Sequence, residues 1–350
     1  MRAALMTAVN EVRVDDLPQP TLDGSAAILR VESCGICGTD ARTFFHGDPR
    51  APVPWVLGHE PVGVLEEVTP GAVLPEGVGQ GDRVFLGSIL YCGECRLCLE
   101  GRQNLCAEKK LYGYDPFPGA FAEYAAVPPI ALRNLYALPP DLPSDLATAA
   151  DPFACALNGV ESAQIRIGDV LAILGAGPIG CVQALMARDA GAGRIYLIEV
   201  SAPRAALARD VVGDLVDEVV EPGPSGGVDE LLELTSGQGA DRVIVACASQ
   251  AAQQAALGLA APAAKVVYFA GLPKANPIVE FDANELHYKE LAVLGAYGAT
   301  PRQYRLTLDL LAREAARAER IVTHRFPLEQ IADGFEAIRE GSGLKVVVRP

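Results

Sequence analysis

The sequence of 350 residues predicts an α/β protein with two domains. Up to about Leu146, short apolar runs such as "AAILRV" and "PVGVLEEV" alternate with Gly and Pro turns, which is typical of a β-rich domain. From about Gly168, strands and helices alternate, which indicates βαβ units on a parallel sheet. The chain is also longer than one small core requires, so we expect about two domains.

The sequence of the second part of the chain predicts individual strands and helices. We expect strands over 170–175, 194–200, 242–248 and 265–271, and helices over 178–192, 202–212 and 250–261. A long helix is expected over 301–320, with the charge-rich "AREAARAER" as a solvated face. The last residues predict a turn, a helix and a final strand that need not join the parallel sheet.

Charge and hydropathy restrict the possible partners. The chain carries 44 acidic and 29 basic residues, a formal net charge of -15, which disfavours binding to nucleic acid or to an anionic membrane surface. We find no apolar run of about 20 residues, as a membrane span needs, and no export signal at the N-terminus. We therefore expect a soluble, cytoplasmic protein whose partner is a small molecule.

The nine cysteines are an odd number, which favours reduced thiols over disulfides. Four of them have the spacing C-x2-C-x2-C-x7-C, which suits a closed tetrahedral zinc site that holds a loop in shape: Cys92, Cys95, Cys98 and Cys106. The alternative is four free thiols, which would invite oxidation. Three isolated cysteines in apolar surroundings are expected in the core: Cys155, Cys181 and Cys247.

The segment "LAILGAGPIG" indicates a dinucleotide site. A strand enters a G-x-G-x-x-G turn and a helix follows, so that backbone amides and the helix N-terminus face a pyrophosphate. The expected contact residues are Gly175, Gly177, Pro178, Ile179 and Gly180. Glu199, at the end of the next strand, is placed to accept hydrogen bonds from a ribose and so favours NAD. Arg204 lies close by and leaves NADP as the alternative.

A catalytic zinc needs three protein ligands and one open position. Only four histidines are available, and His59 in "LGHEPVG" is the best candidate, although a lone histidine is more often structural. The structural interpretation is favoured for the other three: His46, His287 and His324.

Taken together, "CGICGTD", "GHE", the four-cysteine lobe, "GAFAEYAAVP", "GAGPIG" and "THRFPLEQIADGFEAI" resemble the zinc-dependent medium-chain dehydrogenases. The polyol (sorbitol-like) and threonine dehydrogenase branch is the most similar, and the resemblance covers essentially the whole chain. It implies a GroES-like catalytic domain over 1–150 and 294–350, and a Rossmann NAD-binding domain over 151–293. It also implies two zinc ions per subunit, one catalytic and one structural.

The resemblance also assigns roles to residues. It implies that Cys37, His59 and Asp151 bind the catalytic zinc, with Cys34 as a buried neighbour of Cys37. An aspartate departs from the glutamate or cysteine usual at the third position, but a carboxylate oxygen is an acceptable zinc ligand. Glu60 is expected to approach the metal or a water bound to it.

The same resemblance implies a proton relay. Thr39 would accept the alcohol proton, and Asp40 would orient His59. Where relatives often continue the relay with histidine the chain has Arg42, which cannot act as a base. The proton path would then run through the cofactor ribose and water, and Arg42 would either meet an anionic group or lie on the surface. Asn158 replaces another histidine of polyol relatives, and we assign it no role.

These observations predict a zinc- and NAD-dependent dehydrogenase of a secondary alcohol in a polyol, cyclitol or sugar-like compound. One alternative within the enzymes is a dehydrogenase of a hydroxy amino acid such as threonine. Another is a dinucleotide-binding protein without catalysis, which the complete set Cys37, His59, Asp151 and Thr39 disfavours. The resemblance further implies a homodimer or homotetramer formed through the strand near "LAVLGAY".

Overall fold

The computed structural model describes all 350 residues, which form two compact units. One unit comprises residues 1–154 and 299–350, and the other comprises 155–298. Both boundaries fall a few residues later in the chain than the sequence suggested. The first lies within helix α4 (Ala150–Ala163), which begins in one unit and ends in the other.

The first unit is rich in short strands. They are β1 (Arg2–Ala8), β2 (Glu11–Asp16), β3 (Ala27–Ile36), β4 (Trp55–Val56), β5 (Glu60–Val68), β6 (Arg83–Leu86), β7 (Ile89–Leu90), β8 (Lys110–Leu111), β9 (Tyr124–Val127), β10 (Leu135–Ala137), β17 (Val322–Pro327) and β18 (Lys345–Arg349). Its helices are α1 (Gly38–His46), α2 (Arg96–Leu99), α3 (Ser144–Ala147), α10 (Pro301–Arg313), α11 (Ala315–Ala318) and α12 (Ile331–Glu340), with 3-10 turns η1 (Gln103–Leu105), η2 (Pro129–Asn134), η3 (Glu319–Ile321) and η4 (Leu328–Gln330).

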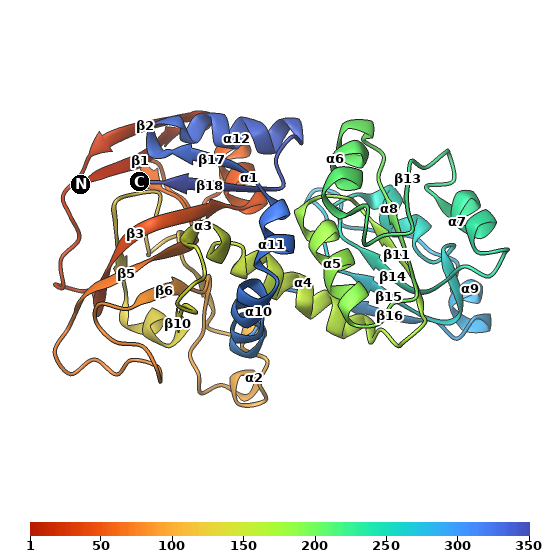
Figure 1. Cartoon of the computed structure of the whole chain (residues 1–350), viewed down its shortest axis with the longest axis horizontal. Coiled ribbons are helices and arrows are strands. Elements are labelled where there is room, and N and C mark those ends of the chain that lie inside the picture. Colours follow the sequence, from red (N-terminus) through yellow and green to blue (C-terminus); the bar gives the residue numbers. More distant parts are fainter. The chain divides into compact units, whose positions relative to one another are not determined.

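The main sheet of this unit pairs strands from the N-terminal and C-terminal parts of the chain. Its strand order is β10-β6-β5-β3-β18-β17, and β9 also pairs with β3. Strand β18 runs antiparallel to β3 (Figure 1). Val348 lies opposite Cys34. The final strand therefore completes the β-rich unit and not the parallel sheet. Consecutive residues of β3 and β18 are buried, because both strands lie inside the sheet.

The second unit holds a six-stranded sheet in the order β13-β12-β11-β14-β15-β16, in which every pair is parallel (Figure 1). Its strands are β11 (Val170–Leu174), β12 (Arg194–Ile198), β13 (Glu218–Val220), β14 (Ala240–Val245), β15 (Ala260–Tyr268) and β16 (Ala292–Gly295), and its helices are α5 (Pro178–Asp189), α6 (Ala202–Val212), α7 (Val228–Leu234), α8 (Gln250–Ala255) and α9 (Ala283–Tyr288). This is the doubly wound Rossmann order, with β11 and β14 at its centre. The predicted α/β fold class is confirmed.

Two expected helices differ from those observed. The helix expected over 301–320 ends at Arg313, because Glu314 adopts φ -106° and ψ 28°, and a short helix and a 3-10 turn follow. This break leaves Ala318 and Ile321 buried, so tertiary packing overrides the helix propensity of the segment. The helix expected over 250–261 ends at Ala255, since β15 already begins at Ala260. No helix is long and apolar enough to cross a membrane.

Candidate active site

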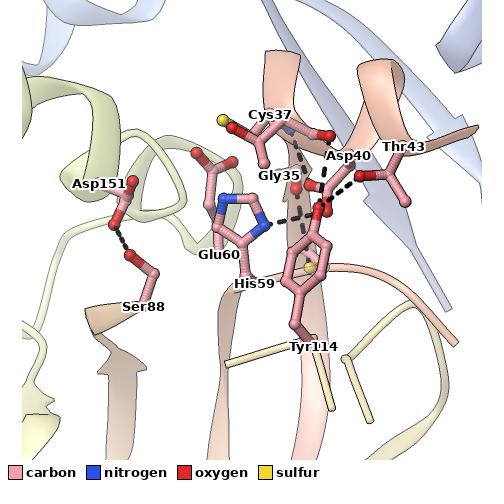
Figure 2. A network of polar contacts seen from close by, with 12 residues as sticks. Gly35, Cys37, Asp40, Thr43, His59, Glu60, Ser88, Tyr114 and Asp151 are labelled. Carbon is pink, nitrogen blue, oxygen red and sulfur yellow. Dashed lines mark hydrogen bonds and ion pairs between the residues drawn. The ribbon is translucent and has the colours of Figure 1, made fainter. Parts of the chain in front are cut away.

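Two neighbouring strands bring together three side chains of types that can bind a metal ion. Cys37 follows the end of β3 and caps the N-terminus of α1, while His59 and Glu60 stand at the start of β5. Strands β3 and β5 are paired with Gly35 opposite Glu60, so the end of β3 lies beside the start of β5. The ligand atoms of Cys37, His59 and Glu60 all lie within 4.8 Å of one another (Figure 2). A thiolate, an imidazole and a carboxylate are a donor set that suits zinc with one position left open.

Asp40 fixes the orientation of His59. The Asp40 side chain is fully buried, and its Oδ1 lies 2.9 Å from His59 Nδ1, while its Oδ2 accepts a hydrogen bond from the backbone N–H of Cys37 at 3.1 Å. Burial lowers the pKa of His59, but the charges of Asp40 and Cys37 outweigh it and raise that pKa well above its usual value. Since Nδ1 is engaged by Asp40, the other ring nitrogen is the one presented to Cys37 and Glu60 (Figure 2).

Lys345 holds Glu60 in a buried ion pair. The Lys345 ammonium, on β18, contacts Glu60 Oε2, and both side chains are almost fully buried. A Cβ atom on Gly35 would lie 2.2 Å from Lys345 Nζ and 2.3 Å from Glu60 Oε2, so a larger residue here would displace the ion pair. Burial raises the pKa of Glu60, Lys345 lowers it, and the nearby charge of Asp151 raises it further. Asp151 therefore lies close enough to Glu60 for the two carboxylates to interact.

Asp151, which the resemblance implies as the third zinc ligand, lies outside the group formed by Cys37, His59 and Glu60. It occupies the first turn of α4 and is 6% exposed. Its Oδ1 accepts a hydrogen bond from the Ser88 hydroxyl at 2.7 Å (Figure 2). The same oxygen accepts a second one from the Tyr304 hydroxyl at 2.5 Å. The structure thus brings Cys37, His59 and Glu60 together and holds Asp151 nearby by two hydroxyl groups.

Three further residues considered in the sequence analysis lie outside the group of Cys37, His59 and Glu60. Thr39 is half-buried in the first turn of α1, and its backbone carbonyl accepts a hydrogen bond from Tyr114 at 3.3 Å. Arg42, on the same helix, is exposed. Asn158 lies in the second unit and donates to the backbone carbonyls of Tyr297 and Gly298 at 3.2 and 3.0 Å, a structural role.

The four-cysteine lobe has the geometry of a closed metal site. The Cys92 sulfur lies 3.9 Å from that of Cys98 and 3.5 Å from that of Cys106, and the sulfurs of Cys95 and Cys106 are 3.9 Å apart. Four Zn–S bonds of about 2.3 Å in a tetrahedron place the sulfurs roughly 3.8 Å apart. Backbone N–H groups of Cys98 and Ala107 lower the pKa of the Cys95 thiol to about 6, which favours the thiolate that zinc requires. The lobe fits one zinc ion.

In the second unit, the glycine turn and Glu199 form one cluster. Gly175 has φ 106°, and a Cβ atom on Gly180 would lie 1.9 Å from the carbonyl oxygen of Gly175, so both positions require glycine. Glu199 Oε2 accepts a hydrogen bond from the backbone N–H of Ala176 at 2.8 Å. The acidic side chain therefore lies directly beside the turn between β11 and α5. Arg204 is half-buried on α6.

Comparisons with known proteins agree with this geometry. The family model "Alcohol dehydrogenase GroES-like domain" matches residues 23–139, and "Zinc-binding dehydrogenase" matches residues 178–313. An L-threonine 3-dehydrogenase of Sinorhizobium medicae is 31% identical over 99% of this chain and 98% of its own. The chain belongs to the zinc-dependent medium-chain dehydrogenase superfamily.

Solved structures of this superfamily superpose over the whole chain. Alcohol dehydrogenase TADH from Thermus sp. ATN1 has a TM-score of 0.88 and 31% identity, with all of both chains covered. A zinc-binding dehydrogenase from Sinorhizobium meliloti, bound to NADP, has a TM-score of 0.86 and 29% identity, covering 100% of this chain and 99% of that one. The dehydrogenase described here is accordingly an oxidoreductase acting on CH–OH groups, with zinc and a nicotinamide cofactor.

Several residues around the site of this dehydrogenase had no sequence signal. Lys345, Ser88 and Tyr304 are polar side chains in otherwise ordinary strands, loops and helices, and each meets its partner from a distant part of the chain. Their roles follow from strand pairing and helix packing, which spacing along the sequence does not reveal.

Proposed function

We propose that this dehydrogenase oxidises a secondary alcohol of a polyol, cyclitol or sugar-like compound, with NAD as the hydride acceptor. The observation that carries the proposal is the cluster of Cys37, His59 and Glu60, whose ligand atoms lie within 4.8 Å of one another and whose imidazole is oriented by Asp40. The proposed catalytic zinc is held by Cys37 and His59 with a carboxylate, for which Asp151 remains our candidate. The four-cysteine lobe holds a second, structural zinc.

The chain's own residues orient the reaction. Zinc supplies a Lewis acid that lowers the pKa of the substrate hydroxyl. Thr39, two residues after Cys37, accepts the hydroxyl proton and passes it to water, since the exposed Arg42 stays protonated. Asp40 keeps the His59 ring in one tautomer through its Nδ1 contact.

The preference for NAD over NADP rests on Glu199. Its carboxylate is 6% exposed and lies beside the glycine turn, where it accepts from the backbone N–H groups of Ala176 and Ser201. A fixed negative charge at the end of β12 accepts hydrogen bonds from the ribose hydroxyls of NAD and repels the additional phosphate of NADP. Arg204 on α6 is the residue that would favour NADP instead.

A second candidate substrate is a hydroxy amino acid. It is favoured by the relatives named L-threonine 3-dehydrogenase, which cover nearly the whole chain at about the same identity as the alcohol dehydrogenase from Thermus. Threonine carries a secondary hydroxyl, as the polyols do, so both candidates require the same zinc chemistry. They differ in the groups that must be recognised beside the reacting carbon.

We further propose a homodimer or homotetramer in the cytoplasm. The last strand of the parallel sheet, β16, pairs with β15 on one side only, and Tyr288 and Tyr297 beside it are exposed. An open sheet edge flanked by exposed aromatic side chains is suited to pairing with a second copy. Four zinc-binding thiolates fit the reducing conditions of the cytoplasm.

Elemental analysis and a substrate panel test the function together. We expect two zinc ions per chain in protein purified without chelator, one in Cys37→Ala, and two in the matched control Cys34→Ala, because Cys34 is a fully buried neighbour outside the ligand group. Polyols, cyclitols, sugars and L-threonine would then be assayed with NAD and NADP. One zinc in the wild type, or equal zinc loss in both variants, would refute the catalytic site. Turnover confined to L-threonine would select the second candidate.

A further inference from the structure

Tyr304 reaches the site from a distant part of the chain. It lies on α10, the first helix after the chain returns from the second unit, and its hydroxyl donates to Asp151 Oδ1 although 153 residues separate them. Its ring is 1% exposed and packs against the rings of Phe85 and Tyr136, with centroids 5.5 and 5.3 Å away. This packing fixes the orientation of the ring and therefore the position of its hydroxyl oxygen.

The start of α10 is also fixed. Thr300 and Gln303 form a capping box, in which the Gln303 side chain accepts from the Thr300 backbone N–H at 2.9 Å. Gln303 is 3% exposed, so the turn that carries Tyr304 is anchored inside the protein. The position of the Tyr304 hydroxyl is therefore set by the fold and not by Asp151 alone.

Glu60 and the nearby Asp151 are held in different ways. Lys345 cancels the charge of Glu60 through a buried ion pair. Ser88 and Tyr304 hold Asp151 through two hydroxyl donors on a single oxygen, which orient the carboxylate.

We propose that Tyr304, together with Ser88, is a positioning residue that holds Asp151 ready for the catalytic zinc. This inference rests on the proposed function, because it assumes a zinc ion at the Cys37 and His59 site. Hydrogen bonds to a metal-binding carboxylate fix its orientation, and loss of such a partner commonly lowers metal affinity by about 10- to 100-fold. Tyr304 does not touch the substrate in this proposal and acts through Asp151.

The chain offers a matched control for the test. Tyr136 is a second buried tyrosine in the same aromatic cluster, and its hydroxyl has no hydrogen-bond partner in the structure. Tyr304→Phe and Tyr136→Phe remove the same atom from neighbouring rings. Only the first removes a contact to Asp151. Ser88→Ala removes the other donor from a different segment, so the test survives if Tyr304→Phe does not fold.

The measurement is release of zinc from the full-length holoenzyme to a graded series of chelator concentrations, with the four-cysteine zinc as internal reference. We expect Tyr304→Phe to release the catalytic zinc about 10- to 100-fold more readily, Ser88→Ala to shift in the same direction, and Tyr136→Phe to follow the wild type. The visible spectrum of protein with cobalt at that site should change in Tyr304→Phe and not in Tyr136→Phe, because these bands report the ligand set.

The outcomes separate the two proposals. If the wild type holds two zinc ions and the release curves of Tyr304→Phe, Ser88→Ala and Tyr136→Phe all coincide with it, the positioning role is refuted and the proposed function stands. A lower melting temperature of Tyr304→Phe with unchanged zinc release and cobalt spectrum would show a packing role only and would also refute the inference. A wild type with zinc in the four-cysteine lobe alone would overturn the proposed function and this inference with it.

Discussion

Glu199 and Glu60 are both buried glutamates, yet their surroundings suit them to different ligands. Glu199 accepts hydrogen bonds from two backbone N–H groups, which stabilise its charge without a counter-ion. Glu60 instead contacts the Lys345 ammonium. The first arrangement leaves a fixed negative charge beside the glycine turn, and the second pairs the charge inside the β-rich unit. Single substitutions distinguish them.

Glu199→Gln should reduce the preference for NAD. Glutamine keeps the size of the side chain and one carbonyl oxygen, which can accept from one of the two loop N–H groups, but it removes the charge. Because hydrogen bonds to a charged acceptor contribute about 1.5–3 kcal/mol, we expect the KM for NAD to rise about 10-fold or more. The KM for NADP should stay constant or fall. Steady-state kinetics with both cofactors measure this, and an unchanged ratio of the two constants would exclude the ribose role of Glu199.

Lys345→Met should destabilise the fold. The substitution keeps the apolar part of the side chain and removes the ammonium, which leaves the Glu60 carboxylate buried without its partner. Breaking one side of a buried ion pair costs about 3–5 kcal/mol in the free energy of unfolding, as urea denaturation would show. The double variant Glu60→Gln/Lys345→Met should recover most of that loss. A double variant as unstable as Lys345→Met alone would argue against the uncompensated charge as the cause.

Asp145 shows how one carboxylate joins several elements. It lies on α3, where its Oδ1 accepts from the Ser33 hydroxyl of β3 at 2.6 Å and its Oδ2 accepts from Arg325 of β17 at 2.8 Å. Arg349 of β18 contacts it as well. These strands are neighbours in the main sheet, so Asp145 links the N-terminal and C-terminal parts of the β-rich unit.

Asp145→Asn should lower stability in a pH-dependent way. Burial raises the pKa of Asp145, but hydrogen bonds from Arg349 and Ser33 and the charge of Arg349 outweigh it, so the pKa is lowered. A lowered carboxyl pKa contributes stability above the unfolded-state value of about 3.9, and this contribution is lost as the pH falls through the folded-state pKa. We expect a loss of about 2 kcal/mol at pH 7 that shrinks below about pH 4. A difference that is the same at pH 7 and pH 3 would contradict this origin.

Elements with strong local signals were predictable, and short ones were not. The glycine turn, the strands before and after it and helix α6 were predicted nearly to the residue, since their apolar pattern and capping are local. Strand β13 and helices α7 and α9 were not predicted, because they are short and carry little periodicity. Such elements are stabilised by the sheet on which they pack more than by their own sequence.

At the scale of the whole chain, the resemblance was confirmed, together with the fold class that it implied. The spacing of the four cysteines predicted a structural metal site, and the resemblance pointed to Cys37 and His59 as ligands of a catalytic one. The partners of these residues could not be predicted, because Lys345 and Tyr304 belong to segments that return to the first unit only after the second unit is complete. Strand pairing and helix packing across such sequence distances leave no pattern in a single sequence.

The open edge of β16 leads to a prediction about assembly. Leu294 is half-exposed on this strand, and Leu294→Lys should place a charge where a second copy would extend the sheet. We expect the wild type to have a mass of two or four chains by light scattering, and Leu294→Lys to shift toward a smaller assembly. Val73→Lys is the matched control, because Val73 is 86% exposed and belongs to the other unit. If Leu294→Lys keeps the wild-type mass while remaining folded by circular dichroism, the copies associate through another surface, whereas a monomeric wild type would remove the need for any interface at β16.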